Sequence, residues 1–329
     1  MRTGFELLRA EKLIRLAIQK VHLNLAGLTV LTEAGSNYFV YTPLIAYYAG
    51  AKKIYVWIKD TKYGKSVDIR EDLLQIAERL NIDSSVFSFA LNERSDEHIS
   101  KADIITNLGF VRPINKEFID LLHPNAVVSY MCEAWEIRPA DVDINFCKEK
   151  NIDVAGVWEN HPELRIFDGC GLLSLKLCLE AGLEIYQNNV LVISSDKFGS
   201  VAADAFQKAG AQTVQTVQPQ NIASLDFSKY DVLFVADYSY EKEIIGEHLV
   251  SHIDQLKSCA VIHLCGCVDF NWLQNEGVFC YPHYNGQKFR MSKTLAHLGM
   301  KPLIDLHTAG LKVGESLYRN IENELVQLI

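Results

Sequence analysis

Short apolar runs alternate with longer amphipathic stretches along most of the chain. Apolar runs of about four to eight residues rich in β-branched side chains are typical of strands, and apolar residues three or four apart are typical of helices. In the first half the pattern predicts strands at residues 28–32, 54–58, 86–90, 103–107, 126–130 and 152–157. In the second half it predicts strands at residues 190–194, 213–217, 232–236, 260–264 and 278–281. Strands that alternate with helices indicate parallel sheets built from right-handed βαβ units.

Helices are predicted between these strands. The first 21 residues carry charges throughout and leave one apolar face, which predicts an amphipathic N-terminal helix. Further helices are predicted at residues 38–49, 68–80, 116–122, 141–150, 201–209 and 243–253. A final helix is predicted after His283, because Val313, Leu317, Ile321 and Leu325 recur at four-residue spacing.

A long apolar segment divides the chain in two. Between residues 162 and 187 apolar side chains fall on nearly every face of the predicted helix, as expected of a helix buried between two halves. A chain of 329 residues is also too long for one ordinary hydrophobic core. We therefore expect an α/β protein with two Rossmann-like or flavodoxin-like parallel-sheet domains. The first spans residues 1–187 and is completed by a C-terminal helix within 286–329, and the second spans 188–285.

Composition and charge exclude several classes of protein. The hydrophobic fraction of 49% and the charged fraction of 22% are typical of a globular chain. A net charge of −9 without any Lys/Arg-rich run leaves no basic surface for nucleic acid. No apolar run approaches the length of a membrane span, and the charged N-terminus lacks the apolar core of a signal peptide. The eight cysteines lie mostly in apolar segments, which favours reduced thiols in a cytoplasmic protein.

The triplet Cys265, Gly266 and Cys267 raises the question of a metal site. Two thiolates so close together could ligate a soft metal ion. No second cluster of cysteine or histidine supplies the remaining ligands. We therefore predict no metal, and expect these residues to pack at the end of a strand.

The turn after the first strand of the second domain has the place of a dinucleotide-binding loop. In open α/β sheets, ligands bind beyond the carboxyl ends of the strands, where helix N-termini donate N–H groups. The candidate cofactor-binding residues there are Ser194, Ser195, Asp196, Lys197, Phe198 and Gly199, together with Asp237 and Gly266 after neighbouring strands. Of the G-x-G-x-x-G pattern only the third glycine, Gly199, is present, and Asp196 puts a negative charge where a diphosphate would lie. Two hypotheses stay open: NAD or NADP binds here, or the fold binds no dinucleotide.

The loop of residues 33–37 in the first domain is a second candidate phosphate site. It lies between a predicted strand and helix, and Asp60 follows the next strand, as in a mononucleotide-binding half. The alternative is an ordinary helix start capped by Ser36 or Asn37.

Charged residues that follow other strands are candidates for catalysis. Arg112 precedes Pro113 and could hold a substrate carboxylate, or pair with a neighbouring acid. Glu133, Glu136 and Arg138 form either a functional cluster or an internal ion-pair network. His283 is the candidate general acid or base, because it follows the last strand of the second domain. Two other histidines are expected to be structural: His263 and His307.

The order of these features resembles the D-isomer-specific 2-hydroxyacid dehydrogenase superfamily. Residues 137–144 and 152–157 look like that family's passage from a helix to a strand, and residues 260–269 look like its late strand and small-residue turn. Pro282 and His283 are similar to its late Pro-His dipeptide. The resemblance covers most of the chain in topology and implies that His283 is the catalytic histidine. The family's glycine fingerprint and N-R-G turn are not matched, and its catalytic arginine has no unambiguous counterpart in Arg112 or Arg138.

The sequence therefore predicts an NAD(P)-dependent oxidoreductase that acts on a small hydroxy or oxo acid in the cleft between the domains. His283 would exchange the substrate proton, and Arg112 or Arg138 would hold the carboxylate. The alternative is a divergent Rossmann-fold protein without a dinucleotide. It would serve as a ligand-binding or scaffold subunit, or as a non-redox enzyme that uses Glu133 and Glu136. A cytoplasmic homodimer is expected in either case.

Overall fold

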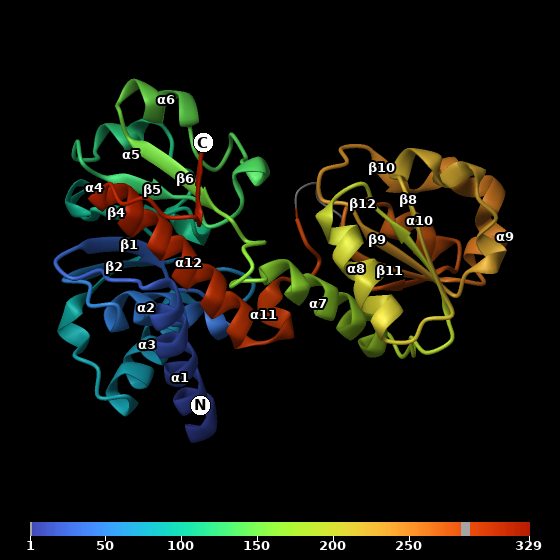
Figure 1. Cartoon of the computed structure of the whole chain (residues 1–329), viewed down its shortest axis with the longest axis horizontal. Coiled ribbons are helices and arrows are strands. Elements are labelled where there is room, and N and C mark those ends of the chain that lie inside the picture. The colour runs from blue at the N-terminus through green and yellow to red at the C-terminus, as the bar shows by residue number, and fades with distance from the viewer. Residues whose placement is uncertain (1, 284–289) are drawn as a thin grey trace. The chain divides into compact units, whose positions relative to one another are not determined.

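The computed structural model describes residues 2–283 and 290–329, which form two compact units (Figure 1). The first unit comprises Met1–Ile166 and Gly299–Ile329, and the second comprises Phe167–Leu298. The sequence predicts the boundary at residue 187, after the long apolar helix. In the structure that helix, α7 (Ile166–Glu180), belongs to the second unit from Phe167 onward, and Phe167 packs against Phe198 there.

The first unit is built on a seven-stranded sheet of order β14-β6-β5-β4-β1-β2-β3. All of its strands pair in parallel except β14, which runs antiparallel to β6. The strands are β1 (Thr29–Glu33), β2 (Lys53–Ile58), β3 (Phe87–Leu91), β4 (Ile104–Thr106), β5 (Val127–Ser129), β6 (Asp153–Val157) and β14 (Val326–Leu328). Because the strands are parallel, their carboxyl ends share one edge of the sheet.

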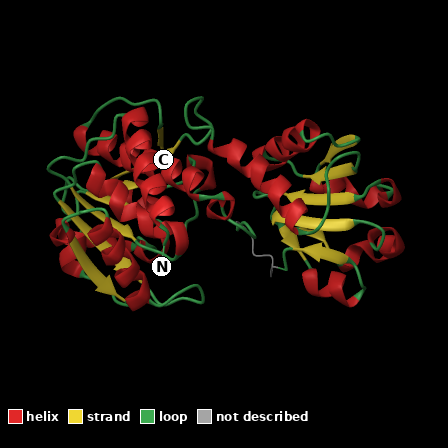
Figure 2. Ribbon diagram, turned by 90° about the horizontal axis from the view of Figure 1, so that it is seen from below, coloured by secondary structure: helices red, strands yellow, loops and turns green. Residues whose placement is uncertain are grey.

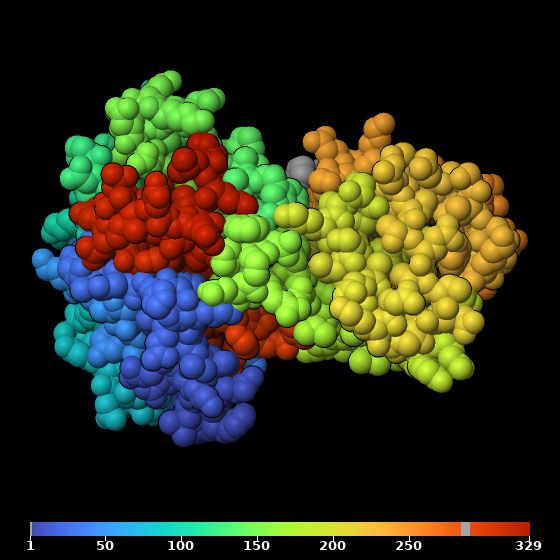
Figure 3. Space-filling model, viewed as in Figure 1, coloured from blue at the N-terminus to red at the C-terminus, as the bar shows by residue number. Residues whose placement is uncertain are grey.

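Helices cover both faces of this sheet, as Figure 2 shows. One face carries a buried apolar core that includes side chains of α4, α5 and α6. The other face contacts α2 and α12, and α1 packs on those two helices (Figure 1). The space-filling view shows the C-terminal part of the chain in red beside the blue N-terminal part, and most residues of α12 are buried (Figure 3). The helices are α1 (Gly4–Val21), α2 (Thr42–Tyr48), α3 (Ser66–Arg79), α4 (Asp96–Lys101), α5 (Lys116–Asp120), α6 (Ile144–Glu149) and α12 (Met300–Arg319), and the 3-10 turns are η1 (Asn37–Tyr41), η2 (Ser84–Val86), η3 (Gly109–Val111) and η4 (Ala134–Glu136).

The second unit is built on a parallel five-stranded sheet of order β13-β11-β9-β7-β8. A separate parallel pair, β10 and β12, lies in the same unit. The strands are β7 (Asn189–Ile193), β8 (Thr213–Val217), β9 (Val232–Ala236), β10 (Glu243–Ile245), β11 (Ala260–Cys265), β12 (Cys267–Val268) and β13 (Phe279–Tyr281). The helices are α7, α8 (Lys197–Lys208), α9 (Ile253–Leu256), α10 (Phe270–Asn275) and α11 (Leu295–Leu298), and the 3-10 segments are η5 (Pro219–Ser224), η6 (Phe227–Lys229) and η7 (Glu247–His252). The expected α/β class with two Rossmann-like parallel sheets is confirmed.

Three helix predictions are wrong in part. The predicted helix at 243–253 is instead strand β10, the 3-10 segment η7 and the start of α9, because Glu243 pairs with Cys267 of β12. The C-terminal helix ends at Arg319, where Asn320 takes a left-handed conformation, so the last two members of the predicted apolar stripe lie beyond it. Helix α7 is not buried on every face, since Leu172 and Leu179 are 54% and 63% exposed. Among the described residues no helix is long and apolar enough to cross a membrane.

Candidate functional site

The turn between β7 and α8 is held by the carboxylate of Asp196. Asp196 is the N-cap residue of α8, and its Oδ1 accepts the N–H of Phe198 at 2.9 Å. Gly199 lies one turn further, where an added Cβ would come within 2.1 Å of the Ser194 Cβ. Gly199 therefore keeps the third glycine's role of letting the helix approach the strand.

Asp196 and Asp237 together close the carboxyl ends of β7 and β9, and we call this pair the carboxylate clasp. The Oδ2 of Asp196 accepts the N–H of Tyr238 at 2.6 Å. In the opposite direction, the Oδ2 of Asp237 accepts both the N–H and the Oγ–H of Ser195 at 2.6 Å. The Oδ1 of Asp237 also accepts the N–H of Tyr240 at 2.7 Å. Each strand end thus supplies a carboxylate to the backbone donors of the other.

The clasp carries concentrated negative charge. Asp237 is fully buried. Burial raises the pKa of the Asp196 carboxyl, and the neighbouring charge of Asp237 raises it further. Gly266 supports the arrangement at a φ of +117°, where an added Cβ would lie 3.1 Å from the carbonyl oxygen of Asp237.

The residues of this turn do not fit the diphosphate of a dinucleotide held in the ordinary way. Such a diphosphate needs backbone N–H donors at the start of the helix. The N–H groups of Ser195, Phe198 and Tyr238 already bind the carboxylates of the clasp. A bound diphosphate would have to displace those carboxylates and lie beside their charge. Lys197 offers a cation near the turn, and its ammonium lies 5.3 Å from the ring centre of Phe167.

The carboxyl edge of the first sheet carries a second group of polar residues. In the order of the strands, Glu159 follows β6, Cys132 and Glu133 follow β5, Asn107 follows β4 and Glu33 ends β1. The adjacent strands therefore bring these residues to one edge of the sheet.

Glu33 lies where the strand order changes direction, between β1 and β4. Its carboxylate accepts the N–H of Phe110 in η3. Gly109 takes a φ of +35°, and any Cβ there would collide with the Glu33 carboxylate. Burial raises the pKa of Glu33, while the Phe110 N–H and the charge of Arg112 act in the opposite direction.

The helix after the 33–37 loop starts differently from the prediction. Ser36 precedes η1 but makes no side-chain capping bond, and Asn37 takes a positive φ of 55°, so the predicted cap is wrong. Asp60 accepts the N–H of Ser66 at 2.8 Å and its Oγ–H at 2.7 Å. Asp60 therefore anchors the start of α3.

The two candidate arginines of the first unit share one acid. Arg112 Nη1 lies 2.7 Å from Asp141 Oδ2, and Arg138 Nε lies 3.1 Å from the same oxygen. Arg112 thus pairs with a neighbouring acid, which is the alternative that the sequence left open for it. Both guanidinium charges also act on Cys132, where they partly offset the rise of its pKa.

Glu133 and Glu136 have different surroundings. Glu133 is 1% exposed, accepts the indole N–H of Trp135 and accepts the N–H of Asn160 at 3.3 Å. It therefore ties the loop after β5 to the loop after β6. Glu136 accepts the N–H of Glu133 at 3.1 Å through Oε2.

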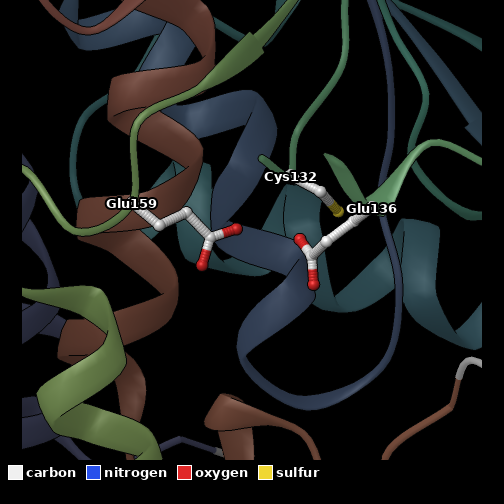
Figure 4. Close-up of side chains that lie close together, drawn as sticks. All are labelled: Cys132, Glu136 and Glu159. Atoms are coloured by element: carbon white, nitrogen blue, oxygen red, sulfur yellow. The ribbon is translucent and has the colours of Figure 1, made fainter. Parts of the chain in front are cut away.

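Glu136 also belongs to a cluster with Cys132 and Glu159. One thiol or carboxylate atom from each residue lies within 4.8 Å of the others, and Figure 4 shows the two carboxylates directed toward each other beside the sulfur. Burial raises the pKa of the Cys132 thiol well above its ordinary value, and Glu136 and Glu159 add to the rise. From the sequence, Glu33 is part of the candidate phosphate loop at residues 33–37, whereas Cys132 and Glu159 are assigned no role. The signal that marks them is their position at or just after a predicted strand.

His283 lies two residues after the end of β13 in the second unit and is exposed. Its Nδ1 is 2.5 Å from Nε2 of Gln274 in α10. The arginines and glutamates above belong to the first unit. The convergence of His283 with them on one substrate therefore stays a prediction.

Comparison with known proteins identifies the fold. No protein-family model and no curated protein sequence matches the chain. A dipicolinate synthase protein from Bacillus halodurans matches 91% of this chain and 99% of its own length, with a TM-score of 0.54 and 14% identity. A dipicolinate synthase protein from Bacillus subtilis matches 91% of this chain and 97% of its own length, with a TM-score of 0.52 and 12% identity. The chain has the fold of these proteins.

A 2-hydroxyacid dehydrogenase from Ketogulonicigenium vulgare Y25 matches 84% of this chain and 98% of its own length, with a TM-score of 0.49 and 10% identity. The expected α/β architecture is confirmed as a fold by the two dipicolinate synthase structures. At these identities the likeness extends to the fold and not to a substrate.

Proposed function

We propose that this chain is a non-redox enzyme for a small hydroxy or oxo acid, working without a dinucleotide bound in the ordinary way. The carboxylate clasp is the observation that carries the proposal. It uses the N–H groups of Ser195, Phe198 and Tyr238 that a diphosphate would need. It also places two carboxylates where the diphosphate charge would lie.

The charges of the first unit support a small acid as the substrate. Arg112 and Arg138 both face Asp141, and a substrate carboxylate has the same shape and charge as that acid. The Arg112 side chain is 32% exposed, so solutes reach it. Glu136 lies near Cys132, on which both guanidinium charges act, so it belongs to the same charged edge of the sheet. Glu133 acts as a positioning residue through its bonds to the two loops.

A thermal-shift titration with NAD⁺, NADH, NADP⁺ and NADPH tests the absence of an ordinary dinucleotide site. A ligand at a hundred times its Kd raises the stability of the folded state by about 2.7 kcal/mol. We expect no shift of the wild-type midpoint at millimolar concentration of any of the four. Asp196→Gly, which removes one carboxylate and restores the missing glycine, is the matched variant and should gain a shift. A wild-type shift with any dinucleotide would overturn the proposal.

The second candidate function is an NAD(P)-dependent oxidoreductase for the same class of substrate. The close packing of Gly199 on Ser194 favours it, because that packing is retained from the dinucleotide-binding pattern. His283 would be its general acid or base. On this account His283→Ala lowers turnover by about 10²- to 10⁴-fold and leaves the dinucleotide affinity unchanged. Equal turnover of the variant would remove His283 from the mechanism.

The oligomeric state is a further part of the proposal. A twofold homodimer is the commonest symmetric assembly of soluble proteins. Sedimentation equilibrium should give twice the chain mass of 37.1 kDa, and a monomer across the micromolar range would contradict it. We also propose a cytoplasmic location, in keeping with the cysteines that lie mostly in buried segments.

A further inference from the structure

Three ligand-type side chains converge at the carboxyl edge of the first sheet. Cys132 and Glu136 come from the loop that follows β5, and Glu159 comes from the loop that follows β6. The two strands are neighbours and run parallel, so the loops leave the sheet side by side. One sulfur and two carboxylate oxygens lie within 4.8 Å of one another (Figure 4).

The positions of the three atoms are close to those of a coordination shell. Zinc binds sulfur at about 2.3 Å and carboxylate oxygen at about 2.0–2.2 Å, so the ligand atoms of a tetrahedral site lie about 3.3–3.8 Å apart. Side-chain movements of about 1 Å therefore close the cluster around an ion. Glu136 accepts the Glu133 N–H on Oε2, which fixes its carboxylate beside the loop after β5.

The composition of the cluster favours a thiophilic cation. Glu136 and Glu159 are 8% and 7% exposed, and two carboxylates drawn together in so little solvent repel each other. A dication between them offsets that repulsion. The third ligand-type atom is the sulfur of Cys132, which lies within 4.8 Å of both carboxylates. Magnesium does not use sulfur ligands, whereas zinc does.

We propose that Cys132, Glu136 and Glu159 bind a divalent thiophilic ion of the zinc type. Three protein ligands leave a fourth position open, as in catalytic zinc sites. A hydroxyl or carboxylate oxygen of a small acid fits that position, and this last step rests on the proposed function. Binding of the ion itself depends only on the three side chains.

The test is a titration of the chelator-treated full chain with Co²⁺, which reports a thiolate ligand through a charge-transfer band in the near ultraviolet. We expect one Co²⁺ per chain, the thiolate band, and its loss when Zn²⁺ is added. Mg²⁺ in excess should not displace the Co²⁺. Cys132→Ser should abolish the band, and Glu159→Gln should weaken Co²⁺ binding at least about tenfold. Cys267→Ser, a partly exposed cysteine of the second unit, is the matched control and should bind like the wild type.

Two results would overturn the proposal. One is the absence of stoichiometric Co²⁺ binding by the wild type at micromolar concentration, and the other is a thiolate band that persists in Cys132→Ser. Far-ultraviolet circular dichroism of each variant checks the fold, and Glu136→Gln, which keeps the acceptor for Glu133, supplies a second ligand variant. The readout is independent of turnover and of dinucleotides. A dinucleotide shift would therefore overturn the proposed function and leave the metal result unchanged.

Discussion

Each of the two large sheets has carboxylate side chains at the point where its strand order reverses. The two sets of carboxylates differ in number and in the charges around them. In each unit the strand order changes direction next to the first strand, between β1 and β4 in one and between β7 and β9 in the other. Both places hold carboxylates that accept N–H groups from the neighbouring loop, and of these Glu33 and Asp196 are half-buried and Asp237 is fully buried. In the first unit the carboxylate is that of Glu33, whose pKa burial raises while the Phe110 N–H and the charge of Arg112 offset part of the rise. In the second unit it is a pair, Asp196 and Asp237, in which each charge faces the other.

On the proposed function, the difference distinguishes the two units as binding sites for a small acid. Open α/β sheets bind ligands where the strand order reverses. The carboxylate clasp fills that place in the second unit with internal negative charge. The first unit instead has two guanidinium groups at the same edge as its acids, shared through Asp141. A small acid is therefore better accommodated by the first unit than by the second.

The largest expected effect is the loss of Asp237. Its two oxygens accept hydrogen bonds from Ser195, Ser239 and Tyr240, and the residue is fully buried. Asp237→Ala leaves those donors without their acceptor and should lower the free energy of unfolding by about 3 kcal/mol or more. Urea unfolding measures it. Asp231→Ala, which removes one acceptor of the Asn189 N–H at the opposite edge, is the control and should cost about 1 kcal/mol. Equal losses in the two variants would show that the clasp adds nothing.

Loss of Glu33 should have a smaller effect, because a single backbone donor depends on it. Glu33→Ala removes the acceptor of the Phe110 N–H and should cost about 1–3 kcal/mol in the free energy of unfolding. Glu33→Gln retains an acceptor oxygen and removes the buried charge, so it should lie close to the wild type. The comparison is made by the same urea unfolding. An effect of Glu33→Gln as large as that of Glu33→Ala would contradict the role given to the hydrogen bond.

The two buried histidines, His263 and His307, should make the folded chain less stable at acidic pH. Burial lowers the pKa of His307 to about 3 and that of His263 to about 4, from an ordinary value of 6.5. Above pH 6.5 both histidines are neutral in the folded and unfolded chain, so their contribution is fully present. As the pH falls below 6.5 the unfolded chain gains protons that the folded chain does not, and stability is lost toward pH 4 and 3.

His307→Gln in the first unit and His263→Gln in the second should each make that loss shallower. Thr42 Oγ lies 2.7 Å from Nδ1 of His307, and a glutamine amide keeps a polar partner for it. Thermal unfolding from about pH 7 to about pH 4 measures the slope. Slopes identical to the wild type in both variants would contradict the assignment of the two histidines.

The smallest effect is expected for Asp196→Asn. The pKa of Asp196 is raised, so its ionised form is disfavoured in the folded chain and the charge lowers stability at neutral pH. Asparagine keeps an acceptor for Phe198 but turns its NH2 group toward the N–H of Tyr238, so the loss of that hydrogen bond offsets the relief of the charge. We expect a net change of less than about 1 kcal/mol at pH 7, which becomes a loss of stability below the ordinary pKa of 3.8, where the relief of the charge disappears. Thermal unfolding at pH 7 and below pH 3.8 measures the stability of the variant relative to the wild type. A relative stability that rises at acidic pH would contradict the prediction.

The apolar pattern predicted most of the fold. Strands β8 and β9 have the bounds expected from the sequence, and the remaining predicted strands of the two large sheets lie within two residues of theirs. The failure at 243–253 has a physical cause. Ile244 and Ile245 are buried by the short pairing of β10 with β12, and such a contact between distant segments overrides local helical spacing.

The sequence predicts at which edge of the sheet the candidate residues lie, but it does not predict which groups they bind. Parallel strands place Arg112, Glu136, Asp196 and Asp237 at carboxyl edges, and the sequence pattern alone supports that much. It does not show that Asp196 binds the N–H of Tyr238, because that bond joins residues 42 positions apart. For the same reason, the proximity of Glu159 to Cys132 appeared only when β5 and β6 were paired.

The central claim is that backbone donors of the β7–α8 turn are bound by the carboxylate clasp, and amide hydrogen exchange measured by NMR tests it most directly. The account predicts slow exchange for the N–H groups of Ser195, Phe198 and Tyr238 in the wild type, unchanged by millimolar NADH, and faster exchange for Phe198 and Tyr238 in Asp196→Ala. Exchange of these amides as fast as that of exposed loops, or new protection when NADH is added, would contradict it.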